Sequence, residues 1–115
     1  MRIEGQGLLL RIFVGEADRW QGRPLYEALV LRARERGLAG ATVTRGVLGF
    51  GAHSRLHAAK VLRLSEDLPL VIEIADREDR IRGFLPECDA MIGDGLVTLE
   101  PIEIVRYAPG DAPRE

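Results

Sequence analysis

The residues with the clearest chemical potential lie between Arg36 and Ser65, a stretch without aspartate or glutamate in a chain otherwise rich in both. Basic side chains, two histidines and closely spaced glycines occur there, namely Arg36, Arg45, Gly46, Gly49, Gly51, His53, Arg55, His57, Lys60 and Arg63. Cationic side chains attract an anion, and glycines let backbone N–H groups approach it closely. The pattern therefore indicates an anion-binding loop. A basic surface strand pair that only keeps the protein soluble is the alternative interpretation.

Other residues that could bind a metal or act as a nucleophile give weaker support for a functional site. His53 and His57 are four residues apart, but they flank an expected loop and no third metal ligand lies nearby in the sequence. A histidine that hydrogen-bonds phosphate or backbone is therefore favoured over a metal site. Ser54 and Ser65 have no evident His/Asp partner in the sequence for nucleophilic catalysis. We assign no catalytic residue and no metal ligand and expect a protein that is not an enzyme, keeping catalysis by the histidine pair as a third hypothesis.

Composition narrows the class of protein. The 115 residues fit one domain, 46% hydrophobic residues can build one core, and 30% charged residues are typical of a globular chain. A net charge of -2 argues against nucleic acid as a partner. The one cysteine, Cys88, excludes an internal disulfide and fits a reducing cytoplasm. We expect a cytoplasmic protein with a single domain over residues 1–107 and a flexible tail at residues 108–115.

Hydrophobic patterning predicts four strands. They are expected at residues 8–14, 41–50, 68–75 and 96–107, with a break at Pro101 in the last. The first is an apolar run interrupted by Arg11. A polar loop is expected at residues 16–22, another loop at residues 51–58, and a ribbon that extends it at residues 59–64.

Two helices are predicted between these strands. Pro24 suits a first helical position and Gly37 a stop, which bounds one helix. Asp76 is expected to cap the other. Its apolar stripe repeats at three and four residues, through Ile81, Phe84, Leu85, Cys88, Met91 and Ile92. Cys88 lies on this stripe, so we interpret it as a core residue and not as a nucleophile.

The order strand, helix, strand, strand, helix, strand predicts an α+β fold, a ferredoxin-like βαββαβ sandwich of two layers. Two protein classes with this order fit poorly. Acylphosphatases rely on an asparagine, and the sequence contains none. RNA-recognition domains need aromatic residues on the central strands, and only Phe13 and Phe50 are available for base stacking.

Two segments resemble the P-II signalling proteins. Gly49-Phe50-Gly51 matches the G-F-G that opens their long T-loop, and Ile92-Gly93-Asp94-Gly95 matches the I-G-D-G of their B-loop. Further blocks are similar to an uncharacterised P-II-like family, the domain of unknown function 190, at residues 24–27, 37–42, 49–57, 64–69 and 95–98. The resemblance covers about residues 7–107.

This resemblance implies a P-II-like homotrimer whose sheets face inward, with ligand clefts between neighbouring subunits that hold adenine nucleotides in P-II proteins. The implied site residues are Gly49, Phe50, Gly51, Arg55, His57, Gly93, Asp94, Gly95, Leu96 and Arg106. Leu96 replaces a P-II lysine, and Leu70 and Ile72 stand where P-II proteins carry a lysine on the third strand. No cofactor is required, and a ligand with fewer phosphates than ATP, AMP or ADP, is expected.

The leading hypothesis is a cytoplasmic trimeric sensor. An adenine nucleotide in the cleft would change the T-loop-like segment at residues 51–60, which would then regulate a partner protein. The sequence does not identify this partner; a membrane transporter or channel is the class that we consider. The alternative is an interaction module without a nucleotide, whose basic loop docks on an acidic partner or a membrane protein.

Overall fold

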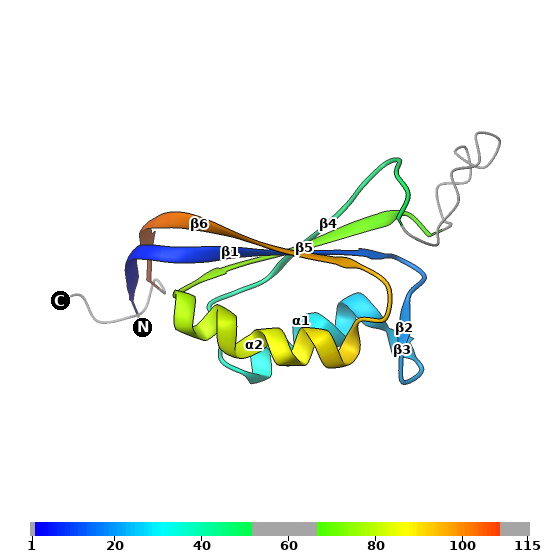
Figure 1. Cartoon of the computed structure of the whole chain (residues 1–115), viewed down its shortest axis with the longest axis horizontal. Coiled ribbons are helices and arrows are strands. Elements are labelled where there is room, and N and C mark those ends of the chain that lie inside the picture. The colour runs from blue at the N-terminus through cyan, green and yellow to red at the C-terminus, as the bar shows by residue number, and fades with distance from the viewer. Residues whose placement is uncertain (1, 52–66, 109–115) are drawn as a thin grey trace.

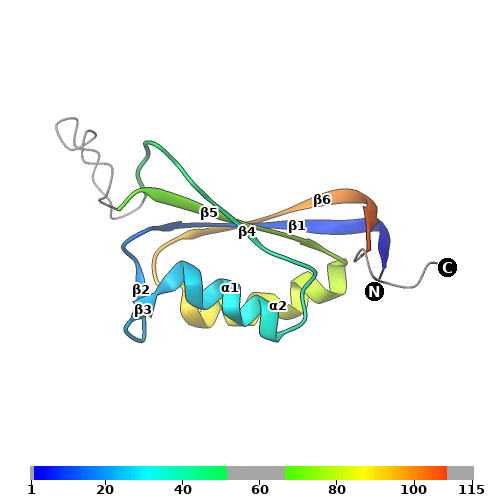
Figure 2. The same ribbon diagram turned by 180° about the vertical axis from the view of Figure 1, so that it is seen from behind.

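The computed structural model describes residues 2–51 and 67–108. In these ranges four strands form an antiparallel sheet in the order β4-β5-β1-β6. Its strands are β1 (Ile3–Gly15), β4 (Thr42–Arg45), β5 (Pro69–Asp76) and β6 (Leu96–Tyr107), and the helices are α1 (Leu25–Glu35) and α2 (Glu78–Met91). Both helices cover one face of the sheet (Figure 1), and the view from behind shows the same two layers (Figure 2). The predicted ferredoxin-like βαββαβ sandwich is thereby confirmed.

The core lies between the sheet and the two helices. Alternate residues of a strand point to one face, so the central strands each present a row of aliphatic side chains to the helices. Buried residues of the sheet are Leu8, Leu10, Ile12, Val14, Leu70, Ile72 and Ile74, and those of the helices are Leu25, Ala28, Leu29, Ala33, Ile81, Phe84, Cys88 and Met91. The predicted stripe on α2 is therefore confirmed as a core face, with Leu85 and Ile92 at its partly buried margin.

The opposite face of the sheet has an ion-pair cluster at its centre. Nε of Arg11 donates to a carboxylate oxygen of Glu73 at 2.8 Å, and Nη1 donates to Glu100 at 2.9 Å. Arg11 interrupts the apolar run of β1 in the sequence because its side chain points away from the core. All three side chains are partly exposed, so the pairs orient the strands more than they stabilise them.

Two strand boundaries on this side of the sheet differ from the prediction. β1 begins at Ile3, not at residue 8, because its first residues pair with the C-terminal half of β6. The expected break at Pro101 is wrong, since β6 runs without interruption from Leu96 to Tyr107. β6 is the edge strand of the described sheet. A proline is tolerated there because one side of the strand has no hydrogen-bonding partner to lose.

The prediction of a strand at residues 41–50 is also wrong beyond Arg45, where β4 ends. The N–H of Gly46 donates to the carbonyl oxygen of Pro69 at 2.7 Å. Pro69 has no N–H to return this bond, so the ladder ends here. A Cβ at Gly46 or Gly49 would lie 2.8 or 3.0 Å from Cγ of Pro69, so the chain crosses the proline ring at two glycines. The ribbon expected at residues 59–64, most of the loop at residues 51–58 and the tail beyond Ala108 lie outside the described residues.

Both helices begin one residue later than predicted. Pro24 is the cap position of α1, which begins at Leu25. Asp76 is not the cap of α2, because the cap position is Arg77, and the fully buried carboxylate of Asp76 accepts the N–H of Ala39 at 2.9 Å.

The loop expected at residues 16–22 includes one arm of a small hairpin, β2 (Arg19–Trp20) with β3 (Arg23–Pro24). Its turn residues Gln21 and Gly22 have φ of 49° and 78°, as a type I′ turn requires. In the described ranges, no helix has the length and apolar character needed to cross a membrane.

The thiol of Cys88 is predicted to be unreactive in the folded protein. Burial raises its pKa from 9.0 to about 11, so the nucleophilic thiolate is scarce near neutral pH. We expect a thiol-specific disulfide reagent at pH 8 to label Cys88 only after unfolding in guanidinium. The unfolded thiol ionises near 9.0 and the folded one near 11, so this group's contribution to stability is lost as the pH rises through that interval. Fast labelling of the native protein would contradict the assignment.

Candidate functional site

A pocket lies at the end of the sheet where β1 ends and β6 begins. Its volume is about 220 Å³, and it is lined by Phe13, Val14, Gly15, Asp18, Gly49, Phe50, Gly51, Asp67, Pro69, Asp94 and Gly95. The structure thus brings residues 49–51 together with Asp94 and Gly95, although the two segments are far apart in the sequence. Gly93, next to them, lines a more open hollow on the other side of Gly95.

The pocket forms where the strand ends meet. Gly15 at the end of β1 pairs with Pro69 at the start of β5, and Phe13 pairs with Leu96 at the start of β6. β4 pairs with the other side of β5 and stops at this same end of the sheet. The segment that follows β4 therefore lies over Pro69. The register of the sheet therefore decides which loops can meet here.

The glycines of the pocket have packing roles. A Cβ at Gly95 would lie 2.9 Å from the carbonyl oxygen of Phe13 and 2.9 Å from Cγ2 of Ile92. Gly49 is similarly confined by the ring of Pro69. By contrast, a Cβ at Gly93 would meet nothing within 4 Å. Contact with the backbone of Phe13 thus accounts for Gly95, and contact with the ring of Pro69 accounts for Gly49, whereas the packing does not explain Gly93.

Two aspartates that the sequence analysis did not select also line the pocket. A carboxylate oxygen of Asp18 accepts the N–H of Gly15 at 2.9 Å, and one of Asp67 accepts the N–H of Ala17 at 3.0 Å. These bonds hold the turn that follows β1. The available sequence signal was weak: aspartates in a short polar loop after a buried strand often accept nearby backbone N–H groups.

Arg36 and Arg45, the two cations of the acid-free stretch that the structure describes, are not among the residues that line the pocket. Arg36 is paired with Glu87, and Arg45 is paired with Glu16. Arg55 and His57 lie outside the described residues, as do His53, Lys60 and Arg63. Within the described part of the chain, the pocket lining contains three carboxylates and no basic side chain. Nor do the described residues include a cluster of three or more side chains that could hold a metal ion.

Leu96 and Arg106 lie at opposite ends of β6. Leu96 is exposed beside Gly95, whereas Arg106 is exposed close to Tyr107, which pairs with Ile3 at the start of β1. At about 3.3 Å per residue, roughly 30 Å separates them along the strand. Figure 1 shows this separation, with the C-terminal end of β6 far from the turn between α2 and β6. Arg106 therefore cannot reach the pocket of its own protomer.

Apolar side chains are exposed on the rim of the pocket. After β4, Val47 is 82% exposed, Leu48 is 55% exposed and Phe50 is 71% exposed. Leu96, on the other side of the pocket, is 56% exposed. Large apolar side chains grouped in this way are typical of surfaces that contact a ligand or another protein.

Two glycines of the turn before β6 offer a matched test of this packing. We expect Gly95→Ala to lower the free energy of unfolding by about 1–3 kcal/mol, because the new Cβ would push against backbone that cannot yield cheaply. Gly93→Ala should change it by less than about 0.5 kcal/mol. Urea unfolding followed by circular dichroism measures both, and equal losses would contradict the close approach at Gly95.

The sequence is similar to those of an uncharacterised protein family. The model of the DUF190 family, described as "Uncharacterized ACR", matches residues 7–104. A "UPF0166 protein" of Aquifex aeolicus is 43% identical over 97 residues, covering 84% of this chain and 91% of that protein. "UPF0166 protein MJ1524" of Methanocaldococcus jannaschii is 29% identical over 99 residues, covering 85% and 91%.

Solved structures of CPII from Thiomonas intermedia K12, described as a nitrogen regulatory PII-like protein, have a similar fold. The complex with ADP and bicarbonate has a TM-score of 0.57 at 20% identity, covering 90% of this chain and 91% of that one. The apo form has a TM-score of 0.53 at 18% identity, covering 94% and 100%. The fold is therefore P-II-like, as the two glycine-containing segments indicated. Because the family match spans most of the sequence, the chain belongs to the DUF190 family.

Proposed function

We propose that this protein is a cytoplasmic P-II-like signalling protein that binds an adenine nucleotide, AMP or ADP, between neighbouring protomers of a homotrimer. The observation that carries the proposal is the pocket that joins residues 49–51 to Asp94 and Gly95. Its volume of about 220 Å³ is below the roughly 300 Å³ of the smallest typical ligand sites. One protomer thus supplies part of a nucleotide site, and a neighbour would supply the rest.

The charges of the pocket also support a nucleotide site that is shared between two protomers. Three aspartates line it, and carboxylates repel phosphate but accept the hydroxyl groups of a ribose. Since the described lining contains no basic side chain, we assign the phosphates to a cation outside that lining. Arg106 is exposed and has no ion pair among the described residues, and a guanidinium forms strong charge-assisted hydrogen bonds with phosphate. We assign the base and ribose to the pocket and the phosphates to Arg106 of the next protomer.

A nucleotide in this position would act on the segment that regulates a partner. Residues 49–51 form one wall of the pocket and lead directly into the T-loop-like segment at residues 51–60. A ligand that contacts this wall differently in two loop conformations shifts the population between them. The solved CPII structures with ADP, with ADP, AMP and acetate and with ADP, AMP and bicarbonate support this choice of ligand. The proposal contains no catalytic step.

Arg106 is expected to contribute to nucleotide binding. Isothermal titration with AMP, ADP and ATP should give saturable binding of AMP or ADP at one site per protomer. Arg106→Ala should weaken it about 10- to 100-fold, because a charge-assisted hydrogen bond to phosphate is lost. Arg34→Ala is the matched control, since Arg34 is an exposed arginine on α1 without an ion pair in the described ranges. An equal effect of the two substitutions would contradict the role of Arg106.

Mixed trimers can show whether the site is shared between protomers. Phe50→Glu places a carboxylate on the exposed rim of the pocket, and Arg106→Ala removes the cation, so neither variant alone should bind ADP well. After the two proteins are unfolded together and refolded as a mixture, about a quarter of the clefts should combine an intact pocket with an intact arginine. Binding restored to about that fraction supports a shared site. A mixture that binds no better than its components contradicts it.

The exposed side chains of Val47, Leu48 and Phe50 favour one alternative, an interaction module without a nucleotide. In that case the loop region would dock on a partner protein through these apolar groups and the basic residues beyond them. Absence of heat with every nucleotide, together with an unchanged melting temperature, would replace the nucleotide sensor with this module.

A further inference from the structure

Arg106 lies in an irregular part of β6. Gly5 pairs with Ile104 and Ile3 pairs with Tyr107, so the two residues Val105 and Arg106 lie opposite the single residue Glu4. This is the arrangement of a β-bulge, which bends a strand and changes the direction of its side chains. Val105 is 82% exposed, and Arg106 is exposed as well. The extra residue in the register interrupts the alternation of side chains between the two faces at these positions.

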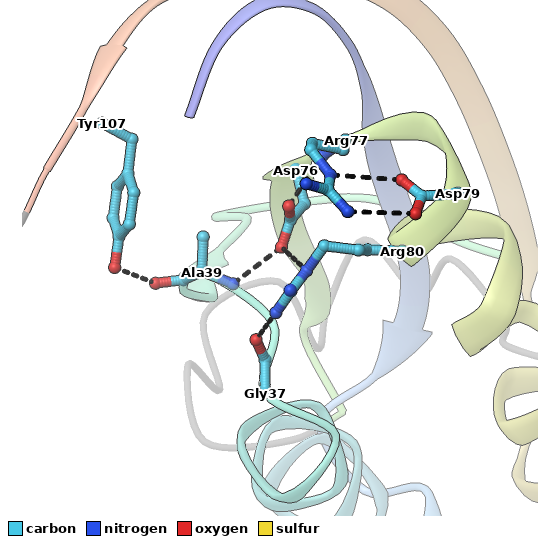
Figure 3. Close-up of polar contacts among 7 residues, drawn as sticks. All are labelled: Gly37, Ala39, Asp76, Arg77, Asp79, Arg80 and Tyr107. Carbon is cyan, nitrogen blue, oxygen red and sulfur yellow. Dashed lines mark hydrogen bonds and ion pairs between the residues drawn. The ribbon is translucent and has the colours of Figure 1, made fainter. Parts of the chain in front are cut away.

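The residue after the bulge is fixed by a distant part of the chain. The hydroxyl group of Tyr107 donates to the carbonyl oxygen of Ala39 at 2.9 Å. Figure 3 shows the tyrosine pointing from the end of β6 to the connection between α1 and β4. On the other strand, Ile3 is 3% exposed and pairs with Tyr107. The bulge is thus followed by a residue that is held on both sides.

The backbone of Ala39 is itself held by a hydrogen bond. Its N–H donates to Oδ2 of Asp76 at 2.9 Å, and this fully buried carboxylate also accepts the N–H of Arg77 at 2.7 Å and Nε of Arg80 at 3.2 Å. A second guanidinium nitrogen of Arg80 donates to the carbonyl oxygen of Gly37 (Figure 3). The carbonyl that accepts the bond from Tyr107 therefore belongs to a residue whose own N–H is held by the buried carboxylate at the end of β5.

The acid opposite the bulge does not neutralise Arg106. Glu4 is paired instead with Arg2, at 2.9 Å. Among the described residues, no carboxylate forms an ion pair with Arg106, so no acid in that part of the chain occupies its guanidinium donors. The local structure thus holds the backbone next to this arginine, and no side chain in the described ranges is paired with its guanidinium.

We propose that Tyr107 is a positioning residue: its bond to Ala39 holds the bulge that directs Arg106 outward, toward a ligand on a neighbouring protomer. For the identity of that ligand the inference rests on the proposed function. The positioning itself is a property of one protomer and can be measured without any ligand.

The test uses Tyr107→Phe in the full chain, which removes only the hydroxyl group. Amide hydrogen exchange in residues 102–107 should become about three- to tenfold faster, as expected for the loss of one hydrogen bond. The dissociation constant for ADP should rise by a similar factor of about three to ten. In an Arg106→Ala background the same substitution should leave the dissociation constant unchanged, because Tyr107 acts through Arg106.

Tyr26→Phe is the matched control. Tyr26 is the other tyrosine of the chain and packs against the core from α1, and its hydroxyl has no hydrogen bond among the described residues. Equal weakening of ADP binding by Tyr107→Phe with and without Arg106 would overturn the inference, as would unchanged exchange. If the wild-type protein binds no ADP, the proposed function fails. Exchange alone then decides whether Tyr107 positions Arg106.

Discussion

The structure depends on the pairing of β1 with strands on both of its sides. β1 meets β5 from Leu8 to Gly15 and β6 from Ile3 to Phe13, so one strand sets the register of both neighbours. Its even-numbered residues from Leu8 to Val14 form the centre of the core. A slip of one residue would turn this row to the solvent. The same register places the pocket at one end of the sheet and the bulge at the other.

The fold was largely predictable from the sequence because strong apolar patterns mark its central elements. The stripe of α2 and the run at residues 68–75 have such patterns, and the structure shows them as a core helix and a core strand. Predictions failed where a tertiary contact decides the local structure. β4 stops at Arg45 because Pro69 lies beside Gly46, and Asp76 contacts Ala39, a residue that no local rule connects with it.

The candidate site was predictable only in part. Its glycine-containing segments were found, because glycine is informative where backbones approach closely. Its charges were not found, since the sequence cannot show that Glu16 pairs with Arg45 or that Asp18 and Asp67 face the same hollow. Arg106 was selected by resemblance, but its distance from the pocket follows only from the register of β6. Interactions between segments far apart in the sequence thus limited the prediction.

Pro101 limits how another molecule can bind to the sheet. A free strand edge can add an extended peptide through backbone hydrogen bonds, which accept almost any sequence. On β6 such an added strand would find no backbone N–H donor at Pro101. Backbone pairing along the full strand is therefore disfavoured. A partner at this edge, another copy of this chain included, therefore gains less from backbone pairing and depends more on the fit of its side chains.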